Sequence, residues 1–348
     1  MTDEIIVIRA GQSPRLNAVL THALRNVPHT VYDADALPAL QNRRVLFAVS
    51  VEPFGMNEQT VRLLTRIRQE TDCLKGSFGA MLIDAEGELY SKQLAHMLML
   101  SCNQAGCRFM GRPLVEATGS LHNLDIQSKR LGLDNLNTYY TLAKNLVHRL
   151  RDFAPKRIRK PKLLMLHASN RQTSNTIALG EAVCSRLQDK ISIRELSLRN
   201  GAVLDCNGCS YQVCSHFAEQ GSCFYGGAMV AEVYPAVLES DLLMILCPNY
   251  NDAVGANILA FINRLTSLTV NNLLEGKLLY SIVVSGYSGS DLVAQQLLGA
   301  LSLNKAFSLP PRCCLMETAN DPGAALRLPG IEQRINAFAA SILREIEH

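Results

Sequence analysis

The chain has 348 residues, of which 48% are hydrophobic and 19% charged, and its formal net charge is +3 at pH 7. These values are typical of a globular protein with a substantial core, and they exclude a general electrostatic attraction to nucleic acids or membranes. No apolar run approaches the ~20 residues of a transmembrane helix, and the acidic N-terminus does not resemble a signal peptide. We therefore expect a cytoplasmic protein of about two domains.

The first half alternates short apolar runs, typical of buried strands, with amphipathic helical segments. The predicted strands are Ile5–Ile8, Val45–Val51, Ala80–Ile83 and Leu114–Glu116, and the predicted helices include Val61–Ile67, Leu94–Leu100 and Thr138–Leu150. This alternation indicates a parallel α/β sheet. A basic run bounded by prolines follows, and it predicts a linker at 155–161 between a domain at 1–154 and a second at 162–348.

The second half repeats this plan with five strands and interleaved helices. The predicted strands are Leu163–Leu166, Ile191–Leu196, Leu242–Leu246, Leu279–Val284 and Cys314–Glu317, and the predicted helices include Val230–Leu238, Ala256–Leu265, Asp291–Leu301 and Ile331–Ile346. The halves also share residues spaced 200 positions apart: Gly55 and Gly255, Asn57 and Asn257, Gly76 and Gly276, Arg112 and Arg312. We infer a duplicated domain.

The loop after strand Leu163–Leu166 is rich in small and hydroxyl-bearing residues and leads into a predicted helix. A helix start offers backbone N–H groups and a favourable dipole to an anion, and Arg171 adds a positive charge. The alternative is an ordinary turn capped by Ser174 or Asn175.

Two more loops are expected at the same sheet edge, because the carboxyl ends of parallel strands meet there. They are Cys247–Ala253 and Ser285–Ser290, which contribute aromatic side chains and glycines. Together the three loops would suit a planar polar ring attached to a phosphate. The alternative is that Tyr250 and Tyr287 are edge aromatics and that the glycines only make turns.

These residues resemble a known family. Ala168-Ser169-x-Arg171-x-x-Ser174-Asn175-Thr176, Pro248-x-Tyr250-Asn251 with Phe261-Ile262-Asn263-Arg264, and Gly286-Tyr287-Ser288-Gly289 are similar to the flavin loops of NAD(P)H-dependent FMN reductases. The likeness covers about residues 161–320 and implies a flavodoxin-like fold, with strand order 2-1-3-4-5 and helices on both faces. It also implies bound FMN, NAD(P)H as co-substrate and often a homodimer.

By this resemblance, two groups of residues would hold FMN. Ser169, Arg171, Ser174, Asn175 and Thr176 would bind the phosphate, while Pro248, Asn249, Tyr250, Asn251, Gly286, Tyr287, Ser288 and Gly289 would border the ring. The flavin carries the chemistry, so no catalytic side chain is identified, and Tyr250 and Tyr287 are expected to shape the pocket. The sequence departs from the family at Ala168, usually glycine, and at Asn263, commonly aspartate.

Four cysteines lie in an insert of the second half, as Cys206-x2-Cys209-x4-Cys214-x8-Cys223. Iron–sulfur clusters take four cysteine ligands, and iron–sulfur flavoproteins, which this domain resembles, carry one in the corresponding insert, although with tighter spacing. A zinc site would fit the single C-x2-C pair less well. The remaining interpretation is that free thiols line the flavin pocket.

The first half keeps the architecture without the loops. Its first loop has Pro14 where a backbone donor would help, and Glu52, Asp84 and Glu86 place carboxylates near the other two. We expect this copy to bind no flavin and to act as a built-in dimer partner of the second domain.

The interpretation we favour is an FMN-dependent NAD(P)H oxidoreductase that reduces a small acceptor such as a quinone or a flavin. One alternative is a flavin-binding electron-transfer or redox-sensing module that uses the insert cysteines. Another is a non-catalytic α/β interaction protein. The occurrence of several phosphate-binding residue types in one loop argues against it: Ser169, Arg171, Ser174 and Thr176. The sequence does not choose between NADH and NADPH.

Overall fold

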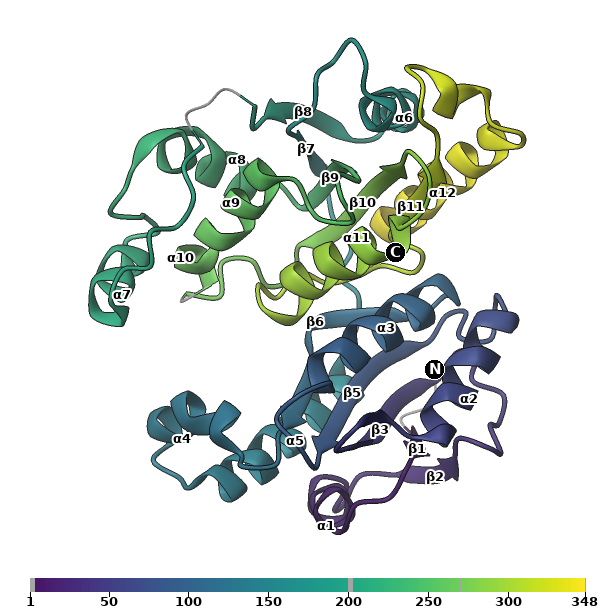
Figure 1. The fold of residues 1–348 in the computed structure, drawn as a ribbon, viewed down its shortest axis with the longest axis vertical. Coiled ribbons are helices and arrows are strands. Elements are labelled where there is room, and N and C mark those ends of the chain that lie inside the picture. Colours follow the sequence, from purple (N-terminus) through teal and green to yellow (C-terminus); the bar gives the residue numbers. More distant parts are fainter. Residues whose placement is uncertain (1–3, 200–202, 270, 348) are drawn as a thin grey trace. The chain divides into compact units, whose positions relative to one another are not determined.

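The computed structural model describes residues 4–199, 203–269 and 271–347. The chain divides into two compact units, Met1–Ala154 and Pro155–His348. Each unit contains one largely parallel β-sheet with helices packed against it (Figure 1), so the predicted α/β fold with two flavodoxin-like units is confirmed. In the described residues, no helix combines the length and the apolar character that crossing a membrane requires.

The N-terminal sheet has the strand order β2-β1-β3-β5-β6, which is the predicted 2-1-3-4-5 arrangement, and the two-residue β4 pairs antiparallel with β3. Its strands are β1 (Ile5–Ala10), β2 (His29–Asp33), β3 (Arg44–Glu52), β4 (Gly55–Met56), β5 (Phe78–Ala85) and β6 (Arg108–Ala117). Its helices are α1 (Pro14–Ala23), α2 (Glu58–Gln69), α3 (Ser91–Gln104), a 3-10 turn (His122–Leu124), α4 (Asp125–Leu131) and α5 (Asn135–Asp152).

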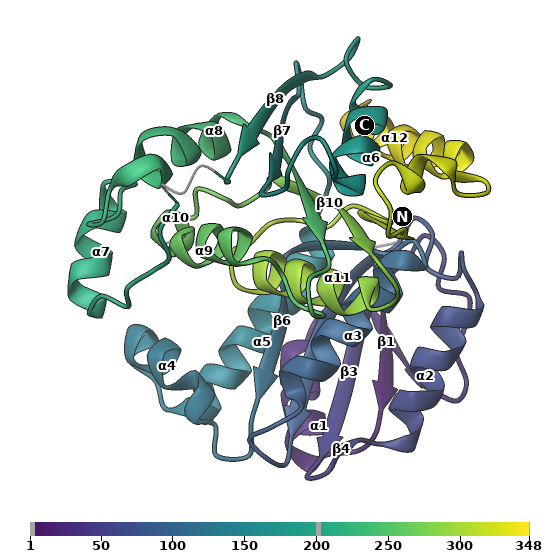
Figure 2. The same ribbon diagram turned by 45° about the horizontal axis from the view of Figure 1, so that its top comes forward.

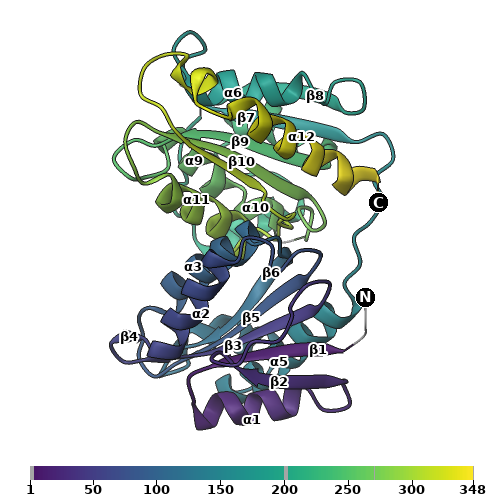
Figure 3. The same ribbon diagram turned by 90° about the vertical axis from the view of Figure 1, so that its right-hand side faces the viewer.

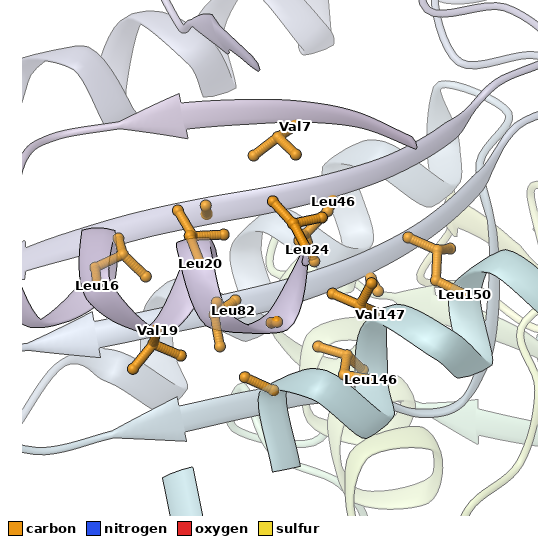
Figure 4. Packing of buried hydrophobic residues seen from close by; sticks show 14 of the residues in the cluster. Val7, Leu16, Val19, Leu20, Leu24, Leu46, Leu82, Leu146, Val147 and Leu150 are labelled. Atoms are coloured by element: carbon orange, nitrogen blue, oxygen red, sulfur yellow. The ribbon is translucent and has the colours of Figure 1, made fainter. Parts of the chain in front are cut away.

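The core of this unit forms because its central strands are apolar on both faces. On one face, α1 and α5 bury Leu16, Leu20 and Val147 against Leu46 and Leu82 of the sheet (Figure 4). On the opposite face lie α2 and α3 (Figure 2). Burying a leucine side chain contributes about 1.5–3 kcal/mol, so these helices hold both sheet faces away from water.

The C-terminal sheet has the order β8-β7-β9-β10-β11, again 2-1-3-4-5. Its strands are β7 (Lys162–His167), β8 (Ser192–Ser197), β9 (Leu242–Pro248), β10 (Leu278–Ser285) and β11 (Cys314–Thr318). Its helices are α6 (Asn175–Cys184), α7 (Tyr211–Glu219), α8 (Tyr234–Glu239), α9 (Ala256–Arg264), α10 (Thr266–Thr269), α11 (Ser290–Leu298) and α12 (Ile331–Glu347), with short helical turns at Met229–Val233, Gly299–Leu303 and Ala324–Arg327. In Figure 3, α6 and α12 cover one face, and α9 and α11 cover the other.

The backbones of the two units agree at two of the four paired positions. Gly76 and Gly276 both adopt positive φ (74° and 84°) two residues before β5 and β10. Arg112 and Arg312 have φ values of 52° and 53°, a conformation that few non-glycine residues adopt. This shared strained conformation supports the inferred duplication.

Strand register gives a residue-by-residue correspondence between the units. Three strand pairings of the N-terminal unit have a counterpart in the C-terminal unit. Met81 pairs with Leu114 as Ser281 pairs with Cys314. Arg44 pairs with Phe78 as Leu242 pairs with Leu278, and Ile5 pairs with Arg44 as Leu163 pairs with Leu242. Taking Gly76 and Gly276 as equivalent, Ile5 corresponds to Leu163 and Ala10 to Ala168.

Some details differ from the sequence predictions. β2 (His29–Asp33) was not predicted, and β6 begins at Arg108 rather than Leu114. Asn57 is the N-cap of α2, whereas Asn257 lies inside α9, whose N-cap is Gly255. The N-cap Asn57 is therefore equivalent to the N-cap Gly255, and the pairings of Asn57 with Asn257 and of Gly55 with Gly255 were both wrong.

Candidate functional site

The loops after β7, β9, β10 and β11 line a cavity of about 560 Å³. Eleven of the thirteen residues expected at FMN line it: Ser169, Ser174, Asn175, Thr176, Pro248, Asn249, Tyr250, Asn251, Gly286, Tyr287 and Ser288. Arg171 and Gly289 do not. The volume lies within the range of small-molecule sites, so the three predicted loops form one pocket.

Four hydroxyl-bearing residues of the segment from β7 into α6 line this cavity: Ser169, Thr173, Ser174 and Thr176. We call Ser169, Ser174 and Thr176 the hydroxyl cluster. Ser174 is the N-cap of α6 and accepts a hydrogen bond from the Ile177 N–H at 3.2 Å, and its Oγ lies 2.7 Å from Thr176 Oγ1.

Ser169 is only 6% exposed, and its Oγ has no hydrogen-bond partner. A buried hydroxyl without a partner costs about 1–3 kcal/mol. The N-terminus of a helix binds anions through free N–H groups and its dipole. The hydroxyl cluster therefore fits the phosphate of FMN.

Arg171 points to a different set of groups. Its guanidinium donates to Glu195 Oε1 at 2.8 Å and to Glu181 Oε1 at 2.6 Å, and these carboxylates raise the pKa of Arg171. Glu195 also lies 3.0 Å from Nε2 of the buried His167. In the structure Arg171 therefore pairs with two nearby acids and does not line the cavity.

Asn249 joins the loops after β9 and β10. Its side-chain Nδ2 lies 3.0 Å from each of Asp252 Oδ1, Ser285 Oγ and the Ser288 carbonyl, and its Oδ1 accepts from the Asp252 N–H at 2.8 Å. Asn251 and Asp252 both have positive φ (54° and 57°). Asn249 thus holds two walls of the cavity together through one amide group.

Gly289 supports this junction without lining the cavity. A Cβ there would lie 2.3 Å from Asp252 Oδ1, and its φ is +85°. Gly276 has nearly the same φ (+84°), but a Cβ at that position would meet no atom within 4 Å. The two glycines therefore separate the effect of backbone conformation from that of crowding.

We expect Gly289→Ala to destabilise the protein more than Gly276→Ala. Both changes incur the cost of positive φ, about 1 kcal/mol, and the crowded site adds about 1–3 kcal/mol. Thermal unfolding of the two variants beside the parent protein measures this difference. Equal shifts in Tm would show that the close approach of Asp252 does not restrict the side chain at position 289.

The mouth of the cavity has two exposed aromatic side chains, Tyr250 (61% exposed) and Tyr287 (85% exposed). The loop after β11 adds Ala319 and Asn320, which the sequence analysis did not include. Asn175 fixes this fourth loop, since its amide donates to the Ala319 and Asp321 carbonyls and accepts from the Ala325 N–H. The signal for the fourth loop was its position after the last strand of the sheet.

The insert cysteines occupy a second pocket. Cys206, Cys209, Cys214 and Cys223 all line a separate cavity of about 330 Å³ that shares no lining residue with the first. The expectation that free thiols line the flavin pocket was therefore wrong. The residues that the structure describes include no group of three or more His, Cys, Asp or Glu side chains placed to hold a metal ion, so the geometry does not fit a cluster or zinc.

The corresponding sheet edge of the N-terminal unit is filled by a side chain. Arg15, near the start of α1, donates to Asp84 Oδ1 at 2.7 Å and to the carbonyls of Ala85, Thr118 and Gly119. Asp84 is 2% exposed and also accepts from Ser13 Oγ at 2.5 Å. This network ties together the ends of β5 and β6 where the C-terminal unit has its cavity.

The chain is similar to an azoreductase from Bacillus anthracis (15% identity, TM-score 0.36, 54% of this chain and 100% of that one) and to Flavodoxin 1 from Bacillus cereus (14%, 0.34, 53% and 97%). It is also similar to RosB, solved with 8-demethyl-8-formylriboflavin-5'-phosphate (16%, 0.42, 54% and 82%). No curated protein gave a significant match.

A family model matches part of the C-terminal unit. Residues 161–321 match the family described as NADPH-dependent FMN reductase, which is the resemblance indicated by the three loops. The match begins just before β7 and ends after the fourth loop, so it includes every residue that lines the larger cavity. Residues 161–321 are therefore similar to the NADPH-dependent FMN reductases, a family of oxidoreductases.

Proposed function

We propose that the protein is an FMN-dependent oxidoreductase that takes electrons from NAD(P)H and passes them to a small acceptor. The observation that carries this proposal is Ser169 Oγ, a buried hydroxyl without a partner on a residue that lines a cavity of about 560 Å³ together with the first residues of α6. The family match over residues 161–321 supports the same chemistry.

Each part of the cavity has a proposed task. The hydroxyl cluster and the first N–H groups of α6 bind the phosphate, and Arg171 is not required for it. The loops joined by Asn249 border the ring, and Tyr250 and Tyr287 stand at the mouth, where a nicotinamide or an acceptor would enter. When bound, FMN supplies the redox chemistry.

Titration of the full-length protein with FMN tests the binding step. We expect quenching of flavin fluorescence and a protein-bound yellow spectrum at a 1:1 ratio. Addition of NADH or NADPH without oxygen should then bleach the spectrum, and adding a quinone should restore it.

The outcomes separate the candidate functions. Binding without bleaching by either nucleotide would favour a flavin-binding electron-transfer module over a reductase. A protein that takes up no FMN would contradict both.

A further inference from the structure

The second pocket combines aromatic rings, thiols and one buried cation, and it lies away from the proposed FMN site. Its walls come from the insert and from the end of α9: Cys206, Gly208, Cys209, Tyr211, Val213, Cys214, Phe217, Ser222, Cys223, Phe224, Tyr225, Asn263, Arg264, Thr266 and Ser267. We call this cavity the thiol pocket. The residues at the mouth of the FMN site precede α9, and the thiol pocket lies at its C-terminal end, about 12 Å along the helix.

Arg264 is the unusual member of this pocket. It is 3% exposed, and within the described part of the chain its guanidinium donates to two carbonyls, Gly226 at 2.8 Å and Leu204 at 3.5 Å. Its Nε has no partner, and it forms no ion pair with any carboxylate of the described residues. A buried charge costs several kcal/mol unless a counter-charge accompanies it, so this position favours an anion.

The neighbouring groups do not supply that anion. The Asp205 carboxylate is exposed and accepts from Asn263 Nδ2 at 2.9 Å and from the Cys206 N–H at 2.6 Å. Burial is the main cause that raises the pKa of the Cys214 thiol, and the neighbouring Cys209, Cys206 and Cys223 raise this pKa further. Cys214 is therefore neutral near pH 7. No carboxylate of the described residues pairs with Arg264, so the pocket has room for an anion supplied by a ligand.

The walls indicate the rest of the ligand. Phe217, Phe224 and Tyr225 make successive edge-to-face contacts with ring centroids 5.5 and 5.2 Å apart. Aromatic walls favour a planar apolar body. A volume of about 330 Å³ is at the lower end for ligand sites, which suits one or two fused rings.

Few hydrogen-bond donors of the thiol pocket are unused, which favours an anion with few oxygen atoms. Thr266 donates to the Asn263 carbonyl and accepts from Lys305 Nζ. The Ser267 hydroxyl lies 2.8 Å from the Tyr234 hydroxyl, and Asn263 donates to Asp205. Phosphate sites generally use several N–H donors, whereas here one guanidinium has an unused donor. A planar carboxylate matches that guanidinium.

We propose that the thiol pocket binds a small aromatic carboxylate, with its acid group on Arg264 and its ring among Phe217, Phe224 and Tyr225. This site is independent of the proposed FMN site, since the two cavities share no residue.

Calorimetric titration of the full-length protein with 2-naphthoate tests the proposal, and the neutral 2-naphthamide is the matched control ligand. We expect naphthoate to bind at least tenfold more tightly than naphthamide, and equally with or without saturating FMN. Arg264→Met should lower naphthoate affinity at least tenfold, and Arg264→Lys should lower it less. Equal binding of both ligands, no binding of naphthoate, or competition with FMN would overturn the proposal.

A second readout does not depend on the folding of an Arg264 variant. Naphthoate should slow the alkylation of Cys206 and Cys209 by iodoacetamide, followed by mass spectrometry, while Cys73 of the N-terminal unit serves as the internal control. Phe224→Ala, at a side chain that is 60% exposed, should weaken this protection. Unchanged alkylation at Cys206 and Cys209 would contradict the assignment even if naphthoate bound elsewhere.

Discussion

Ser169→Asp is expected to lower FMN affinity by at least ~100-fold. The new carboxylate would face the phosphate inside a partly buried pocket, where two like charges about 4 Å apart repel by ~4 kcal/mol at an effective dielectric constant near 20. The milder Ser169→Ala would remove one hydrogen bond to a charged group, worth about 1.5–3 kcal/mol. Fluorescence titration with FMN measures both changes.

Two controls keep this result interpretable. Ser169 Oγ has no partner within the protein, so Ser169→Ala should leave the Tm of the FMN-free protein unchanged or slightly higher. Arg171→Met should change FMN affinity less than about threefold, because Arg171 is engaged by Glu181 and Glu195 and forms exposed ion pairs of little energetic weight. If Arg171→Met weakened FMN as much as Ser169→Ala, the proposed phosphate site would be wrong.

Arg15→Met is expected to destabilise the N-terminal unit by about 3–5 kcal/mol. The change would leave Asp84, which is 2% exposed, without its cation, and removing one partner of a buried ion pair has this cost. It would also remove the Arg15 donor from the carbonyls of Ala85, Thr118 and Gly119, of which the Thr118 carbonyl keeps the Leu121 N–H. Urea unfolding of the full-length chain, followed by circular dichroism, measures the loss.

The control for Arg15 is Arg62, whose guanidinium pairs with Glu58 and Asp35 but is 60% exposed. Arg62→Met should cost less than about 1 kcal/mol. The double variant Arg15→Met with Asp84→Asn should recover part of the loss, because no buried charge then remains. An Arg15→Met protein as stable as the Arg62→Met protein would show that the network around Asp84 does not support the fold.

The strands that organise the site could be predicted from the sequence because they are buried on both faces. β7, β9 and β10 are almost continuous apolar runs, and such runs with a fixed helix spacing define a parallel sheet. The loops that follow them then share an edge. For that reason the sequence alone, without knowledge of long-range contacts, predicted eleven residues that line one cavity.

The missed elements have weaker local signals. β2 is a five-residue edge strand, His29–Asp33, whose side chains are at best half-buried, so its sequence resembles a polar loop. The first part of β6 contains Gly111 and Pro113, residues that are depleted in strands. Pairing with β5 determines the structure there, and that contact is not visible in local sequence.

Side-chain direction was also beyond the sequence. Glu181 and Glu195 are 10 and 24 residues from Arg171, and only the folded positions of α6 and β8 bring their charges to it. The insert cysteines follow the same rule, because the fold places them at the far end of α9 from the FMN site. The residue types suggested phosphate binding at Arg171 and thiol chemistry at the insert cysteines. The positions of these side chains, however, depend on long-range contacts.

The correspondence between the two sheets bears on how the N-terminal unit differs from its counterpart. The helix N-cap comes three residues after Ala10, at Ser13, but six residues after the equivalent Ala168, at Ser174. The connection in the N-terminal unit is thus three residues shorter. Because α1 starts closer to the strand ends, its second residue, Arg15, reaches the ends of β5 and β6. Point substitutions alone would not rebuild a phosphate loop there; a graft would need to lengthen the chain before α1 and remove the arginine.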